Sequence, residues 1–123
     1  SAIVTWRWTG YNALIYLAAT VPADGAGGRL AVVAPKHLLG DLAAALPGAD
    51  SGPEPDLARP LVLLSPTQAK GLEFDSVLVV EPADFGRAEL YVALTRATQR
   101  LGVVHSAALP EGLELEEQAP TTT

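Results

Sequence analysis

The sequence contains neither cysteine nor methionine in its 123 residues. Without cysteine, the chain has no disulfide framework and no thiolate metal site, which is compatible with a reducing compartment. No apolar run approaches the roughly 18 residues that a membrane span needs, and the N-terminus lacks the basic-then-apolar order of a signal peptide. We therefore expect a cytoplasmic protein with no membrane partner. Because the sequence opens on Ser1 without an initiating methionine, we also expect it to be a piece of a longer protein.

Basic residues are also scarce, because eight Lys and Arg stand against 14 Asp and Glu, and the formal net charge is −6. This balance argues against a free-standing nucleic-acid binder with a broad basic face, so any contact with nucleic acid must be local. Hydrophobic residues make up 49% of the chain, which is enough for one core. We expect one folded domain over residues 1–106 and a flexible acidic tail over residues 107–123.

Short apolar runs alternate with segments of helical periodicity. Their unbroken Val and Leu content predicts strands buried on both faces of a parallel sheet. These runs are Leu30 to Ala34, Leu61 to Leu64, Val77 to Val80 and Leu101 to Val104. Apolar spacings of three and four predict helices over residues 11–19, 38–46 and 84–98, the last with Asp84 as its N-cap. Residues 47–60, rich in Gly and Pro, are predicted to form an irregular surface crossover.

This order of elements predicts an α/β fold in which helices flank a parallel sheet. Right-handed crossovers place the loops that follow the strands along one edge, and we expect the chemistry at that edge. No Gly-Lys dipeptide occurs, so a Walker A loop, which supplies backbone donors and a lysine to phosphates, is excluded. Glu81 ends an apolar run as a Walker B acid would, but without a P-loop we interpret it as a strand-end acid. The chain therefore cannot hydrolyse ATP unaided.

Two segments carry the candidate chemistry: residues 64–75, with the sequence LSPTQAKGLEFD, and residues 91–101, with the sequence YVALTRATQRL. A glycine such as Gly71 lets the backbone come close to a ligand, and Glu73 offers a carboxylate acceptor. The alternative is a structural turn whose charged residues face water. Arg96 offers a fixed fork of donors suited to phosphate oxygens. Its alternative is an ordinary arginine at a helix C-terminus, which is the interpretation we prefer for Arg100.

Three further residues of the two segments lie close in sequence to Glu73 or Arg96, and each has its own expected role. Tyr91 and Thr95 are i,i+4 partners on one predicted helix face, where they either support Arg96 or line a cleft between domains. For Tyr91, burial in the core is the alternative. Phe74 is expected to pack in the core rather than to stack on a base.

The two segments resemble motifs V and VI of superfamily 1 helicases of the UvrD/Rep type, whose second RecA-like domain carries K-G-L-E-F followed by Y-V-x-x-T-R-A. The resemblance implies a C-terminal RecA-like (2A) motor domain, with a P-loop NTPase-type parallel sheet that lacks its own P-loop. It implies that Glu73 and Gly71 lie at the ribose of ATP and that Arg96 is the catalytic arginine finger. It also implies nucleic-acid binding by the residues before the glutamate, here Ser65, Thr67 and Lys70.

Two further positions resemble the family more loosely. Residues 6–9, Trp-Arg-Trp-Thr, resemble the N-Y-R-S segment that starts this domain, which implies that Arg7 lies near the nucleotide. The alternatives are a cation-π cluster of Arg7 with its two tryptophans, or an edge that packs on the missing half of the protein. Lys36 stands where the family often has an arginine after a strand, so it replaces a fork of donors by a point charge.

The function implied by the resemblance is that of the C-terminal motor domain of an ATP-dependent DNA helicase or translocase. ATP and Mg²⁺ would bind mainly to the N-terminal RecA-like domain of the same protein, single-stranded DNA is the other expected partner, and the isolated chain is expected to be inactive. Larger helicases of this group insert a separate domain where only residues 47–60 stand here. The alternative is therefore a helicase-like ATPase that acts on RNA polymerase with little unwinding, and a third interpretation is a nucleotide-binding-like module without catalytic output.

Overall fold

The computed structural model describes the backbone of residues 4–9 and the full chain over residues 28–106. The helix predicted over residues 11–19 and the predicted acidic tail over residues 107–123 lie outside the described residues. Within residues 28–106, none of the helices combines the length and the apolar character that a membrane crossing requires.

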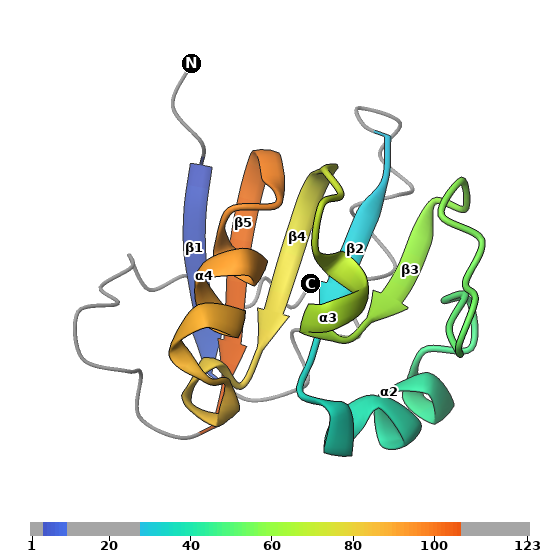
Figure 1. The fold of residues 1–123 in the computed structure, drawn as a ribbon, viewed down its shortest axis with the longest axis horizontal. Coiled ribbons are helices and arrows are strands. Elements are labelled where there is room, and N and C mark those ends of the chain that lie inside the picture. Colours follow the sequence, from blue (N-terminus) through green and yellow to red (C-terminus); the bar gives the residue numbers. More distant parts are fainter. Residues whose placement is uncertain (1–3, 10–27, 107–123) are drawn as a thin grey trace, which may run out of the picture.

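Strands and helices alternate along the described chain (Figure 1). The strands are β1 (Val4–Thr9), β2 (Leu30–Val33), β3 (Leu61–Leu64), β4 (Phe74–Val80) and β5 (Ala97–His105). The α-helices are α2 (Leu39–Ala45), α3 (Pro66–Ala69) and α4 (Arg87–Leu94), and short 3₁₀ turns are η1 (Lys36–Leu38) and η2 (Pro82–Asp84). The strands form one parallel sheet in the order β1-β5-β4-β2-β3, which confirms the predicted α/β class.

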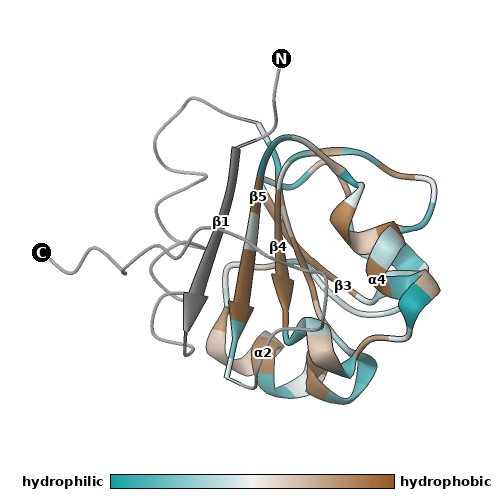
Figure 2. Cartoon of the chain, turned by 90° about the vertical axis from the view of Figure 1, so that its left-hand side faces the viewer, coloured by the Kyte–Doolittle hydropathy of each residue, from teal (hydrophilic) through white to brown (hydrophobic). Residues whose placement is uncertain are grey.

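Both faces of the sheet are buried, as the unbroken apolar runs predict. Alternate residues of β2 show this best, because Leu30 and Val32 join one hydrophobic cluster while Ala31 and Val33 join the other. The first cluster packs against α2, and the second lies under α3 and α4, which cover the front of the sheet in Figure 1. Figure 2 shows the hydrophobic colour concentrated along β4 and β5, between helices of mixed character. The helices therefore bury one side each and leave polar residues outside.

The four predicted strands all occur, as β2 to β5, but β4 and β5 begin three and four residues before the predicted apolar runs. The helix expected over residues 38–46 becomes η1 and α2. Residues 47–60 form the predicted crossover, with one isolated bridge from Asp50 to Val62. Three elements were not predicted, namely β1, the one-turn helix α3 and the 3₁₀ turn η2.

The helix predicted over residues 84–98 is wrong at both ends. Asp84 closes the short turn η2 instead of capping a helix, and α4 begins at Arg87 after Gly86, whose amide donates to the Glu89 carboxylate at 3.4 Å. The helix stops at Leu94, and Ala97 already belongs to β5. Arg96 therefore lies in the turn between a helix and a strand.

Candidate functional site

The predicted site residues lie at two opposite edges of the sheet. In a parallel sheet all strands start at one edge and end at the other, and Glu73 and Arg96 directly precede β4 and β5. Lys36 and Thr67 instead follow the ends of β2 and β3. Since β4 has seven residues, a rise of about 3.3 Å per residue separates the edges by roughly 20 Å. The expectation of a single chemical edge is therefore wrong, and the structure does not bring Lys36 together with Glu73 and Arg96.

At the edge where the strands start, the backbone joins the two motif segments. The Phe74 amide donates a hydrogen bond of 2.9 Å to the Arg96 carbonyl, and the register pairs Phe74 with Ala97. Glu73 and Arg96 consequently precede paired residues of neighbouring strands, whose backbones are about 5 Å apart. The Glu73 side chain is exposed and Arg96 is half-buried. The backbone segments that carry the candidate carboxylate and the candidate guanidinium are thus neighbours at this edge.

The Arg96 side chain folds back over the end of α4. Its Nε donates to the Val92 carbonyl at 3.1 Å, and its Nη2 donates to the Thr95 hydroxyl at 3.1 Å. The Thr95 hydroxyl in turn donates to the carbonyls of Tyr91 at 2.9 Å and Val92 at 3.1 Å. These bonds are the helix-end interaction that the sequence left as the alternative for this arginine. They engage two of the five N–H groups that a guanidinium carries, so the fork keeps donors for an anion.

Gly71 makes the turn that leads from α3 to β4. It follows the helix C-cap Lys70 and has φ of +81°, the left-handed conformation in which glycine is preferred at this position. A Cβ built at Gly71 would meet no atom within 4 Å. The backbone conformation, rather than lack of space, therefore requires glycine here. Lys70 itself is exposed beside the turn.

Arg29 is a site residue that sequence reasoning missed. Its Nη2 donates to the Glu73 carbonyl at 2.8 Å, so it touches the segment that carries the candidate carboxylate. The two residues are 44 positions apart in the chain. Only the pairing of β2 with β4 brings them together, and no local pattern in the sequence indicates it.

At the opposite edge, where the strands end, a groove of about 930 Å³ opens between α2 and α3. It is lined by residues after β2, by the turn around Gly52, and by residues of α3 and η2. Lys36 and Thr67 are exposed on its wall. Ser65 also lines the groove, but it is buried and serves as the N-cap of α3, where its hydroxyl accepts from the Gln68 amide at 3.2 Å. The groove therefore holds the residues predicted at the single strand, except Lys70.

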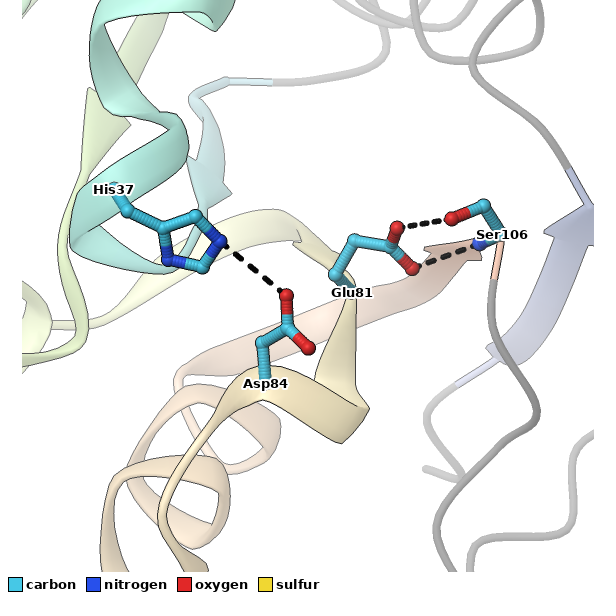
Figure 3. Close-up of polar contacts among 4 residues, drawn as sticks. All are labelled: His37, Glu81, Asp84 and Ser106. Carbon is cyan, nitrogen blue, oxygen red and sulfur yellow. Dashed lines mark hydrogen bonds and ion pairs between the residues drawn. The ribbon is translucent and has the colours of Figure 1, made fainter.

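Two polar contacts connect neighbouring segments at this edge, beside the groove (Figure 3). His37 lies 3.4 Å from the Asp84 carboxylate, which joins the turn after β2 to the turn after β4. Glu81 is buried at the end of β4 with φ of +53°, and its carboxylate accepts from the backbone amide of Ser106 at 2.7 Å and from its hydroxyl. Glu81 is the strand-end acid that the sequence predicts, because it directly follows β4. Its carboxylate also holds Ser106, the residue after β5.

The remaining candidates fall in different places. Arg7 lies within β1, paired in register with Val103 of β5. Tyr91 is 70% exposed, so the interpretation of this residue as core is wrong. Phe74 is buried, as predicted. Arg100 lies in β5 and not at a helix end, so its predicted role is wrong as well.

The described side chains offer no metal centre. Over residues 28–106 there is no group of three or more His, Cys, Asp or Glu side chains that could hold a metal ion.

The comparison with known families covers segments of both edges. The family model described as UvrD-like helicase C-terminal domain matches residues 60–104, which begin at β3 and run through α3, β4, α4 and nearly all of β5. The match supports a relationship of residues 60–104 to the C-terminal domain of UvrD-type helicases. The matched segment includes Thr67, Glu73 and Arg96. No curated protein matches the sequence of the chain.

Solved structures of helicases share the fold of this chain. The C-terminal domain of a possible DNA helicase from Lactobacillus plantarum WCFS1 superposes with a TM-score of 0.71 and 22% identity, covering 90% of this chain and 78% of that one. The arterivirus helicase nonstructural protein 10 in complex with DNA gives a TM-score of 0.62 and 16% identity, and without DNA 0.58 and 17%. The chain spans only 35% and 34% of these two viral chains. At identities of 22% and below, these similarities establish a shared fold.

Two glycines of contrasting geometry test the local structure. Gly71→Ala is expected to lower the free energy of unfolding by about 1–2 kcal/mol, because a Cβ is strained at positive φ. Gly40→Ala, inside α2 and also with no atom within 4 Å of an added Cβ, is expected to raise it by about 0.5–1 kcal/mol. Urea unfolding of both variants measures the difference. Equal effects of the two substitutions would contradict the left-handed turn at Gly71.

Proposed function

We propose that this chain is the C-terminal motor domain of an ATP-dependent helicase or translocase, and that it completes an ATP site held mainly by an N-terminal RecA-like domain of the same protein. The observation that carries the proposal is the hydrogen bond between the Phe74 amide and the Arg96 carbonyl. It keeps the candidate acceptor Glu73 and the candidate finger Arg96 side by side at an edge where another domain can approach.

The chemistry of this edge fits a nucleotide presented from outside. An exposed carboxylate can accept from ribose hydroxyls, and a permanently charged fork can donate to phosphate oxygens. When ATP is bound, it supplies the phosphoryl group whose hydrolysis drives the motor. The chain's own residues orient the sugar through Glu73 and stabilise negative charge through Arg96, which requires the guanidinium to leave its bonds on α4 or to use its remaining donors.

The nucleic-acid strand is proposed to run along α3. Thr67 and Lys70 are three positions apart and both exposed, so they present a hydroxyl and an ammonium on the outer side of the helix, beginning beside the groove. Such groups bind phosphates of a single strand without reading its sequence. The arterivirus helicase of similar fold was determined with DNA, which supports nucleic acid as a partner of this fold. Ser65 takes part through the N-cap that fixes the start of α3.

The role of Arg96 is tested in the protein that joins this chain to its ATP-binding domain. Arg96→Ala is expected to lower the strand-stimulated ATPase rate by about 10³ to 10⁵, the range found when an arginine finger is lost. Arg87→Ala is the matched control, because Arg87 is an exposed arginine at the other end of the same helix. Turnover of the Arg96 variant equal to that of the control would refute the proposal.

Binding of single-stranded DNA is tested by salt dependence. Lys70→Ala is expected to weaken binding at every sequence and to reduce the slope of log affinity against log salt by about one, because one phosphate contact is lost. Thr67→Ala is expected to weaken binding without changing this slope, since no charge is removed. Arg59→Ala, in the exposed crossover loop, serves as control. An unchanged slope for Lys70→Ala would show that this lysine does not meet the strand.

The short connection between α2 and β3 favours a second candidate, an ATPase of the same fold that acts on RNA polymerase. Residues 46–60 contain no helix and no named strand, so no inserted domain stands there to engage a duplex. A strand-displacement assay distinguishes the two. ATPase activity without displacement of a duplex strand favours the second candidate.

A further inference from the structure

Arg29 joins three separate segments at the edge where the strands start. Its Nη1 donates to the Leu57 carbonyl at 2.7 Å, and its Nη2 donates to the Glu73 carbonyl at 2.8 Å. The centre of the guanidinium lies 4.9 Å from the centroid of the Phe74 ring. One planar fork thus ties the crossover loop to the segment that carries the candidate carboxylate, while a buried ring supports it from below.

The backbone of Arg29 is held as firmly as its side chain. Its amide donates to the Asp75 carboxylate at 2.8 Å, and its carbonyl accepts from the Ser76 amide at 3.1 Å. Gly28, with φ of +80°, makes this approach possible, because a Cβ there would collide with the Asp75 carboxylate. The guanidinium therefore extends from a fixed point at the start of β2.

We infer that Arg29 is the positioning residue of the nucleotide site: it sets the place of Glu73 through the Glu73 carbonyl and thereby controls how well the site recognises the ribose. Glu73 itself is exposed, so packing does not hold it. Its backbone is fixed on one side by Arg29 and on the other by Phe74, whose amide bonds the Arg96 carbonyl. This inference rests on the proposed function, because it assumes that Glu73 bonds a ribose hydroxyl.

Lysine cannot replace Arg29 in this role. An ammonium is a point charge on a flexible stem and lacks the planar fork that reaches two carbonyls in fixed directions. Arg29→Lys keeps the charge and most of the length, so it loosens the Glu73 segment with little disturbance of the fold.

The experiment uses the protein that contains this chain and its ATP-binding domain, with ATP and 2′,3′-dideoxy-ATP as substrates. The ratio of the two KM values measures bonding to the ribose hydroxyls. We expect a ratio of about tenfold for the parent protein, as for one hydrogen bond to a charged group, and about one for Glu73→Ala. Arg29→Lys is expected to reduce the ratio at least threefold with kcat for ATP changed less than twofold. Arg59→Lys, in the crossover loop, is the control.

Asp75→Ala is the second variant, because it removes the acceptor of the Arg29 amide and is expected to reduce the ratio in the same way. If Glu73→Ala abolishes ribose discrimination while Arg29→Lys and Asp75→Ala keep it, the positioning role of Arg29 is refuted and the proposed function stands. If Glu73→Ala itself keeps the discrimination, the ribose role of Glu73 fails and the inference fails with it. A fall in kcat for both nucleotides at an unchanged KM ratio would also overturn the inference, since it indicates general loss of folded protein.

Discussion

A backbone hydrogen bond between two neighbouring strand starts, from the Phe74 amide to the Arg96 carbonyl, determines which side chains meet at the candidate nucleotide site. Its position depends on the register of β4 against β5, and that register depends on burial. Phe74 and Ala97 are paired and both belong to the hydrophobic cluster beneath α3 and α4. A slip by one residue would turn these side chains to the other face of the sheet and separate Glu73 from Arg96. Burial of apolar side chains thus determines the register and, through it, which backbone segments are neighbours at this edge.

The residue types alone predict the helices and strands whose pattern of apolar residues is visible within a few neighbouring positions. The unbroken apolar runs predict strands buried on both faces, and the spacing of Leu38, Leu42 and Leu46 predicts α2. Other parts follow from no local rule. The four residues of α3 are too few to show a helical period, and β1 carries Trp6, Arg7 and Trp8 in place of an aliphatic run. Ala97 lies four positions after Ala93 and so mimics a continuing helix, although it is already a strand residue.

The sequence indicates which residues belong to the candidate site, but not where these residues lie in the fold. Motif-like segments indicate Glu73 and Arg96. The general rule that ligands bind where parallel strands end points to the opposite edge of the sheet, because both residues precede their strands. Arg29 escaped prediction for a different reason. Its partners Leu57, Glu73 and Asp75 lie 28, 44 and 46 positions away, so its role exists only after the chain has folded.

Strand β4 connects the two edges directly, with Phe74 at one end and Val80 at the other. An extended strand is close to the greatest length that its covalent geometry allows, and close packing on both faces leaves it no room to bend. The strand therefore keeps a nearly constant length between the two edges of the sheet. The segment that carries Glu73 and the buried Glu81 therefore stay at a fixed separation, whichever edge binds a ligand.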